Sequence, residues 1–126
     1  MEENKIITFK MGAIGLDSPY FSYLKEDEKS FFQKKIDAGI IHTVDVCFND
    51  KSKYGALIAP NKKEILVCEV GGGFAFNIRA LETYCKGLAM FFGAKKIVFE
   101  TSRKAVKIIG DRLNYALNNN RYEKVL

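Results

Sequence analysis

A short segment in the middle of the chain combines residue types that could bind an anion. Three consecutive glycines, Gly71, Gly72 and Gly73, follow an apolar run and let the backbone approach a ligand closely. Asn77 can cap the helix expected after them, and Arg79 then lies in its first turn. A cation there is disfavoured by about 0.3–1 kcal/mol unless an anion binds beside it. The segment therefore predicts either an anion site or a bulged turn followed by an exposed arginine.

The carboxylate closest to these glycines along the chain is Glu69. In the strand expected here it shares one face with Ile65 and Val67. An apolar strand face raises the pKa of a carboxylate towards the range that suits a general base. The alternative is a carboxylate at the end of a strand that points to water, and the sequence leaves both readings open.

Other reactive residue types do not assemble into a second site. Cys47, Cys68 and Cys85 lie in apolar stretches, and their spacings fit no zinc motif. We expect them to be buried, reduced thiols. His42, the single histidine, lies on an apolar strand face and is expected to be a hydrogen-bonded core residue.

The composition, 48% hydrophobic and 28% charged over 126 residues, is that of one soluble globular domain. No apolar run reaches the length of a membrane span, and the N-terminus lacks the pattern of a signal peptide, which predicts a cytoplasmic protein without a membrane partner. Residues 94–126 account for the whole net charge of +5, because they contain eight Lys and Arg but only three Asp and Glu. Such a segment indicates a polyanionic cofactor, a nucleic acid or a solvated helix face, and we favour the last.

The elements that position these residues follow from periodicity and turn residues. Apolar alternation predicts strands at 5–11, 40–48, 54–59, 64–70, 96–100 and 122–126. Helical spacing and capping residues predict helices at 18–24, 25–38 and 77–92, and a last one that begins at Ser102. A turn is expected at 118–120.

The connections predict how these strands pair. Short turns join strands 40–48, 54–59 and 64–70 into an antiparallel meander. The helix at 77–92 forms a crossover between strands 64–70 and 96–100, which therefore run parallel.

This order of elements resembles the GNAT superfamily of acetyl-CoA-dependent N-acetyltransferases. The local likeness is strongest in the segment from Gly93 to Tyr115, where a helix ends in Gly-Ala, a strand follows and another helix closes. Residues 121–126 also look like the last strand of the family, so the resemblance covers about residues 64–126. It implies an α+β, GNAT-like fold over residues 1–126 as one domain, with a mixed central sheet and helices on both faces.

The resemblance also implies a cofactor and a reaction. In GNAT proteins the pyrophosphate of acetyl-CoA lies at the N-terminus of the helix after the fourth strand. The resemblance thus assigns acetyl-CoA to the strand–helix connection, with Val70, Gly71, Gly72, Gly73, Asn77 and Arg79 as the binding residues. Glu69 takes the place of the base that deprotonates an amine substrate.

Two departures from the family pattern leave the activity open. First, the glycines lie too early for the family's phosphate-binding signature, and Phe74 and Phe76 occupy the loop instead. Second, many members have a tyrosine that acts as the general acid in the last helix, but residues 108–110 have no hydroxyl, and Tyr115 is expected to pack in the core. One hypothesis is an active N-acetyltransferase. The other is a catalytically inactive GNAT-fold protein that acts as a binding or structural factor for a protein partner, such as one of a bacteriophage.

Overall fold

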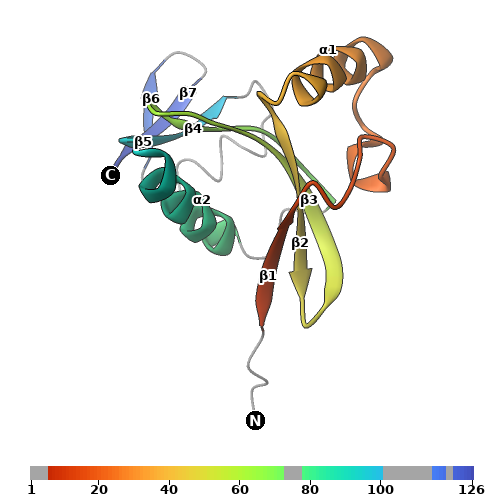
Figure 1. Ribbon diagram of the computed structural model, residues 1–126, viewed down its shortest axis with the longest axis horizontal. Coiled ribbons are helices and arrows are strands. Elements are labelled where there is room, and N and C mark those ends of the chain that lie inside the picture. The colour runs from red at the N-terminus through yellow and green to blue at the C-terminus, as the bar shows by residue number, and fades with distance from the viewer. Residues whose placement is uncertain (1–5, 73–77, 101–114, 119–120) are drawn as a thin grey trace. The chain divides into compact units, whose positions relative to one another are not determined.

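The computed structural model describes residues 6–72, 78–100, 115–118 and 121–126 (Figure 1). Within them, seven strands form one sheet in the order β1-β2-β3-β4-β5-β7-β6. The strands are β1 Ile7–Met11, β2 His42–Phe48, β3 Lys51–Pro60, β4 Ile65–Gly71, β5 Lys96–Glu100, β6 Ala116–Asn118 and β7 Arg121–Val125. The helices are the 3₁₀ helix η1 Pro19–Phe21 and the α-helices α1 Glu26–Asp37 and α2 Ile78–Phe92.

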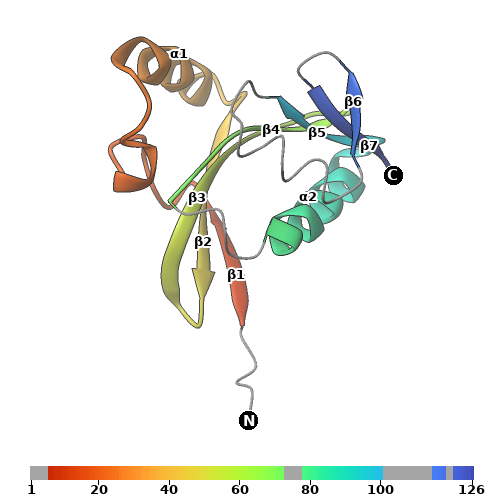
Figure 2. The same ribbon diagram turned by 180° about the vertical axis from the view of Figure 1, so that it is seen from behind.

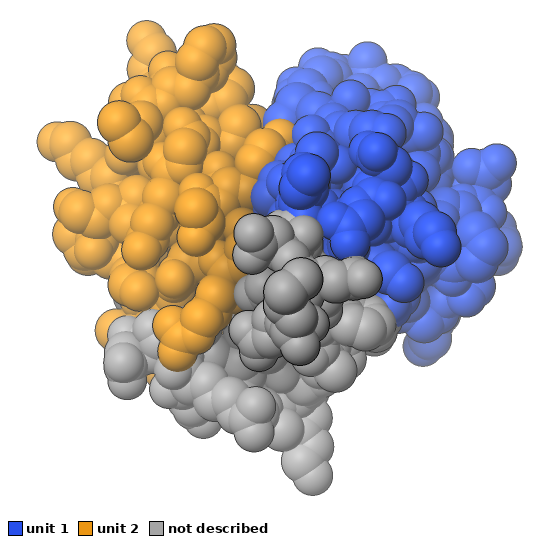
Figure 3. Space-filling model, turned by 90° about the horizontal axis from the view of Figure 1, so that it is seen from below, with its two compact units in different colours: residues 1–57, 70–74 blue, residues 58–69, 75–126 orange. Residues whose placement is uncertain are grey.

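The chain forms two compact units, coloured separately in Figure 3. Unit 1 comprises residues 1–57 and 70–74, and unit 2 comprises residues 58–69 and 75–126. The described parts of β1, β2, η1 and α1 belong to unit 1, whereas α2, β5, β6 and β7 belong to unit 2. Strands β3 and β4 contribute residues to both.

Unit 1 contains the antiparallel strands β1 and β2, and a tight turn joins β2 to β3. β1 and β2 lie side by side (Figure 1) and pair antiparallel. In this pairing Phe9 lies opposite Val46. Asn49 and Asp50, with φ of 51° and 65°, form the two-residue turn into β3. That conformation suits the right-handed twist of a hairpin and is tolerated best by glycine, Asn and Asp. The predicted turn is confirmed, although β3 begins at Lys51 rather than at Tyr54.

The predicted helix start at Ser18 is also confirmed, but the helix is shorter than expected. Ser18 caps η1, its hydroxyl accepting the Tyr20 N–H at 3.4 Å, and Pro19 takes the first helical position. The helix then ends after one turn at Phe21, which is fully buried. Helix α1 follows and ends at Asp37, one residue before the predicted end at 38, and Gly39 just after it has φ of 73°, the left-handed conformation common after a helix.

Unit 2 centres on α2, which packs against β5 (Figure 2). The sequence predicts a buried stripe of Ile78, Leu81, Cys85, Leu88 and Phe92. Leu81 and Cys85 are fully buried, whereas Leu88 and Phe92 are half-buried, and Ala89, which is not in that stripe, is buried beside them. Gly93, with φ of 75°, ends the helix as predicted. β4 and β5 run parallel, with Ile65 opposite Ile97, which confirms the expected crossover topology.

The C-terminal end differs from the sequence prediction in one element. Residues Ala116–Asn118 form a short strand, β6, where only the start of a turn was expected. β6 pairs antiparallel with β7, and β7 pairs antiparallel with β5. The helix predicted from Ser102 lies outside the described residues. Among the described helices, none is both long and apolar enough to cross a membrane.

Candidate functional site

Glu69 lies on β4, two residues before the strand ends at Gly71. It alternates along the strand with Ile65 and Val67, which are buried, and its own side chain is half-buried. The face predicted from the sequence is therefore confirmed. Its role as a general base stays a prediction.

The glycine segment begins inside the strand rather than after it. Gly71 is the last residue of β4 and is buried, whereas Gly72 is exposed and has φ of 95°. That backbone conformation is one that residues with a Cβ atom rarely adopt. Val70, just before them, accepts a hydrogen bond through its carbonyl oxygen from the Tyr23 hydroxyl at 3.4 Å. Gly73 lies outside the described residues.

The structure explains these glycines by the close approach of Tyr20 from η1. A Cβ atom on Gly71 would overlap the main-chain carbonyl of Tyr20 and lie 2.8 Å from the Tyr23 ring. A Cβ atom on Gly72 would overlap the Tyr20 ring, with Cε1 at 2.9 Å, and one on Gly55 of β3 would lie 3.2 Å from Cδ2 of that ring. Gly55, Gly71 and Gly72 thus form a seat for Tyr20, which we call the glycine seat.

A chain of hydrogen bonds fixes the outer end of the Tyr20 side chain. The Tyr20 and Ser52 hydroxyl oxygens lie 2.7 Å apart, and Ser52 donates to Asp45 at 2.5 Å. Because Ser52 has a single proton and gives it to the carboxylate, the Tyr20 hydroxyl is the donor in the first bond. We call this chain of two hydrogen bonds the latch.

The latch ends on a buried carboxylate. Asp45 is 8% exposed, and it also accepts a hydrogen bond from the Cys47 thiol at 3.5 Å. Burial and the Asp45 carboxylate raise the pKa of Cys47, so this thiol is protonated and inert at neutral pH. The sequence reasoning missed Tyr20, Ser52 and Asp45, because hydrogen bonds between residues 7 and 32 positions apart leave no local pattern.

In unit 2, Arg79 is exposed in the first turn of α2. Its main-chain carbonyl accepts a hydrogen bond from Thr83 at 2.9 Å, as a regular helix allows. The side chain is exposed, and its role in binding an anion stays a prediction. Asn77, the predicted cap, lies outside the described residues.

Unit 2 also contains a buried carboxylate that the sequence did not single out. Glu82 of α2 is 5% exposed and pairs with Lys124 at 3.1 Å and with Lys86 at 3.8 Å. Burial by itself raises the pKa of Glu82, but Lys124, the nearby Tyr115 hydroxyl and Lys86 outweigh it and lower the pKa. Glu82 is therefore ionised at neutral pH. Its one sequence signal is Lys86 four residues later.

Tyr115 is a core residue, as expected. It is 6% exposed, its ring centroid lies 5.3 Å from that of Phe99, and Lys124 lies over its ring at 5.5 Å. Burial and the neighbouring Glu82 raise the pKa of its hydroxyl. Within the described residues this hydroxyl makes no hydrogen bond of regular geometry.

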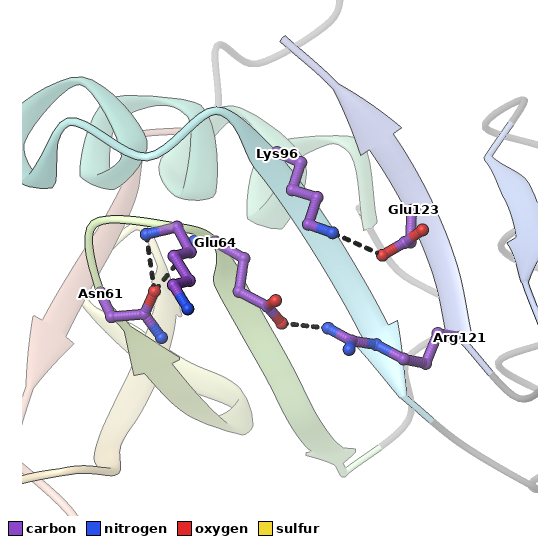
Figure 4. A network of polar contacts seen from close by, with 6 residues as sticks. Asn61, Glu64, Lys96, Arg121 and Glu123 are labelled. Carbon is purple, nitrogen blue, oxygen red and sulfur yellow. Dashed lines mark hydrogen bonds and ion pairs between the residues drawn. The ribbon is translucent and has the colours of Figure 1, made fainter.

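Ion pairs at the surface of unit 2 tie its strands together (Figure 4). Lys96 of β5 pairs with Glu123 of β7 at 2.8 Å, and Arg121 of β7 pairs with Glu64. The first pair joins the neighbouring strands β5 and β7, and the second joins β7 to the residue before β4. Both explain part of the C-terminal positive charge as structural.

The described residues contain no cluster of His, Cys, Asp and Glu that could hold a metal ion. No disulfide joins the three cysteines, all of which lie in the described residues; Cys47 and Cys85 are buried as predicted, whereas Cys68 is half-buried. Burial and the charge of Glu82 raise the pKa of Cys85 to about 12. His42 is half-buried at the start of β2.

No protein-family model matches the sequence, and neither does any curated protein. Solved structures do share the fold. A protein assigned to the GNAT family of acetyltransferases, from Desulfovibrio desulfuricans, aligns with a TM-score of 0.71 over 95% of this chain and 99% of its own, at 12% identity. A GNAT acetyltransferase from Elizabethkingia anophelis, solved with acetyl-CoA bound, gives 0.66 over 95% and 98%, also at 12% identity.

A third structure, a mutant of the toxin AtaT bound to the C-terminus of the antitoxin AtaR, gives a TM-score of 0.62 at 8% identity, over 98% of this chain and 94% of its own. At such low identities these likenesses bear on the fold. The chain has the GNAT fold, with a mixed seven-stranded sheet, and the fold class predicted from the sequence is confirmed.

Proposed function

We propose that residues 1–126 act as one GNAT-like domain that binds acetyl-CoA and transfers its acetyl group to an amine. The observation that carries this proposal is the fold, in which β4 and β5 run parallel, the pairs β1–β2, β5–β7 and β6–β7 run antiparallel, and α2 follows β4. The same fold occurs with acetyl-CoA bound in the Elizabethkingia anophelis protein.

The described residues fit an anionic cofactor in two respects. Gly72 offers exposed backbone that no side chain of its own shields, and Arg79 offers an exposed cation near the N-terminus of α2. In the proposed site Val70, Gly71 and Gly73 add main-chain hydrogen-bonding groups. Asn77 would cap α2 beside the phosphates.

Glu69 is the proposed base. It takes a proton from the amine, directly or through one water, and the freed nitrogen lone pair bonds to the acetyl carbonyl carbon. The carbon–sulfur bond then breaks, and the leaving sulfur takes up a proton from solvent. When bound, acetyl-CoA supplies the acetyl group as a thioester.

Thermal stability with and without acetyl-CoA tests the binding step. At a free ligand concentration of 100 Kd, a ligand that binds only the folded state stabilises it by about 2.7 kcal/mol. We expect a clear rise of the melting temperature with acetyl-CoA. An unchanged melting temperature at millimolar acetyl-CoA would contradict the proposed cofactor.

Acetyl transfer to a panel of amines tests the catalytic step. Glu69→Gln is expected to lower the rate by about 10²–10⁴-fold and to leave acetyl-CoA binding intact, because it removes only the base. Glu26→Gln, an exposed position on α1, makes the same chemical change away from β4 and should leave the rate unchanged. Equal rates in the two variants would remove Glu69 from the mechanism.

One observation favours a second candidate, in which the chain is a binding or structural factor without catalysis, for instance in a bacteriophage. The glycine seat is filled by Tyr20, a residue of the same chain. In that case a specific protein partner is retained in a pull-down with Glu69→Gln, and acetyl-CoA does not stabilise the fold. Loss of that partner in the folded Glu69→Gln variant would contradict this alternative.

A further inference from the structure

The two most exposed large hydrophobic side chains of the described residues are neighbours in the last turn of α2. Met90 is 86% exposed and Phe91 is 83% exposed. The helix packs on β5 through another side, where Leu81, Cys85 and Ala89 are buried. Single exposed hydrophobic residues are common on protein surfaces, but an adjacent pair forms an apolar patch.

Phe92 extends this patch with a half-buried ring. The ring centroids of Phe91 and Phe92 lie 5.2 Å apart at an interplanar angle of 75°, an edge-to-face contact that supports the exposed ring. Met90 beside them has a flexible and polarizable side chain, which adapts to the shape of a partner. We call Met90, Phe91 and Phe92 the apolar end of α2.

Lysines lie beside the apolar end. The Lys95 N–H donates to the Lys63 carbonyl at 3.3 Å, which brings the turn before β4 next to the loop that follows α2. Lys62, Lys63 and Lys95 are exposed, and none of them forms an ion pair within the described part of the chain. Lys86, one helical turn before Met90, is 47% exposed.

The acidic residues of unit 2 do not offset these lysines at the surface. Of those that the structure describes, Glu82 is buried, and Glu64, Glu69 and Glu123 are half-buried. Glu64, Glu82 and Glu123 each pair with a basic residue of the same unit. The exposed side-chain charge of the described part of unit 2 is therefore positive.

An apolar patch beside unpaired lysines is complementary to a segment that is both amphipathic and acidic. The apolar side chains of such a segment cover the apolar end, and its carboxylates meet the lysines. A second copy of this chain is a poorer match, because a twofold interface places the same lysines near one another.

Two other kinds of partner also fit less well. A nucleic acid meets the lysines, but its bases stack on flat rings and offer nothing comparable to Met90. A helix that lies in a membrane surface exposes an apolar face along its length. In α2 the exposed residues before the last turn include Thr83, Lys86 and Gly87, so the apolar face is one turn long.

We propose that the apolar end of α2 and the lysines beside it form a docking surface for an acidic amphipathic segment of another protein. The surface lies at the opposite end of α2 from Arg79, and it is therefore separate from the proposed acetyl-CoA site. The inference goes beyond the proposed function, because docking here requires neither acetyl-CoA nor Glu69.

Peptide selection tests the chemistry of this partner. The full chain is used to select from a phage-displayed library of random peptides of about 16 residues, roughly four helical turns. We expect the selected peptides to be rich in Asp and Glu and to carry apolar residues at helical spacing. Selected peptides without an acidic excess, or a library from which none is selected, would contradict the proposal.

Variants of the full chain then locate the binding of one selected peptide, measured by fluorescence anisotropy. Phe91→Ser should weaken binding about tenfold or more, because it removes the aromatic anchor. Lys95→Glu should weaken it several-fold, and the wild-type affinity should fall at high salt. Phe31→Ser and Lys34→Glu, the same changes at exposed positions of α1, are the matched controls and should leave the affinity unchanged.

Each outcome bears on the docking surface. Weaker binding in Phe91→Ser and Lys95→Glu, with both controls at the wild-type value, supports it. Equal affinity in all four variants places the peptide elsewhere and overturns it.

The other partners are tested with the same Phe91→Ser variant. The proposal is replaced if this variant abolishes binding to phosphatidylserine vesicles or to a DNA duplex while the acidic peptide binds it as well as the wild type. It is also replaced if the wild type is a dimer in sedimentation and Phe91→Ser is a monomer. Acetyl-CoA should stabilise Phe91→Ser and the wild type equally, so the docking surface and the proposed cofactor can fail separately.

Discussion

The two units of this chain differ in net charge and in the contacts that hold their segments together. Unit 1 holds eight Lys and Arg against nine Asp and Glu, a net charge of −1, and it relies on backbone approach at the glycine seat. Unit 2 holds twelve Lys and Arg against six Asp and Glu, a net charge of +6, and it encloses an ionised Glu82 between lysines.

The difference indicates where each unit tolerates change. Addition of a single Cβ atom to the glycine seat destabilises the fold whatever the charge around it, because the main-chain atoms it meets can move only if the backbone shifts. Removal of one partner of a buried ion pair destabilises the fold, because the remaining charge is then buried without an opposite charge beside it. Steric changes should therefore damage unit 1 most, and charge changes unit 2.

The largest expected effect is that of Gly71→Ala in unit 1. The added Cβ atom meets the Tyr20 main-chain carbonyl, so η1 has to shift, and we expect a loss of about 3 kcal/mol in the free energy of unfolding. Chemical denaturation followed by circular dichroism measures it.

The matched control is Gly87→Ala in α2 of unit 2. A Cβ atom there meets nothing within 4 Å, and alanine favours a helix over glycine, so the variant should gain about 0.5–1 kcal/mol. Equal effects of the two alanines would break the comparison between the units.

The next effect is that of Lys124→Met in unit 2. It keeps a long apolar side chain but removes the ammonium group from Glu82, and we expect a loss of about 2 kcal/mol, since Lys124 is partly exposed. Lys95→Met, at an exposed position in the same unit, should stay within about 0.5 kcal/mol of the wild type. A similar loss in both would assign the effect to net charge rather than to the pair.

The pH dependence of stability sharpens the role of Glu82. The pKa of Glu82 in the folded state lies below the ordinary value of a glutamate side chain, so its ionised form stabilises the fold at pH values above that ordinary pKa. The contribution is lost as the pH falls through the folded pKa. Wild type should therefore be more stable than Glu82→Gln by about 1 kcal/mol at pH 7, and the difference should disappear at acidic pH. A difference independent of pH would mean that shape, not charge, is what Glu82 supplies.

The smallest expected effect is that of Lys96→Met at the surface of unit 2. Its pair with Glu123 is partly exposed and screened, so its loss should cost about 0.2–1 kcal/mol. The effect should shrink further in 0.5–1 M salt, roughly as screening requires. A loss larger than that of Lys124→Met would reverse the ranking of exposed and buried pairs.

The sequence predicted most of the elements because their signals are local. Ser18-Pro19 marks the start of η1, Gly39 and Gly93 mark helix ends, and Asn49-Asp50 marks a hairpin turn. Each depends on the backbone preferences of one or two residues, and each is confirmed. Strand β6 was missed because three residues carry too little alternation to identify a strand.

In the candidate site, too, the features that follow from local patterns were predicted, and those that depend on distant residues were not. The face of Glu69 and the exposure of Arg79 follow from strand and helix periodicity, and both are as predicted. The sequence left open whether Gly71 and Gly72 bind an anion or form a bulged turn, and it did not predict that Tyr20 lies against them. That contact joins residues about fifty positions apart, which no local pattern encodes.

By itself, then, the sequence determined the order of elements, the GNAT-like fold class and the strand–helix connection on which the proposed site rests. Only the tertiary structure decided what lies against the glycines and which carboxylates are buried. The reason is physical: periodicity and capping act over one to seven residues, whereas the Tyr20–Ser52–Asp45 latch and the Glu82–Lys124 pair exist only after distant segments have packed together.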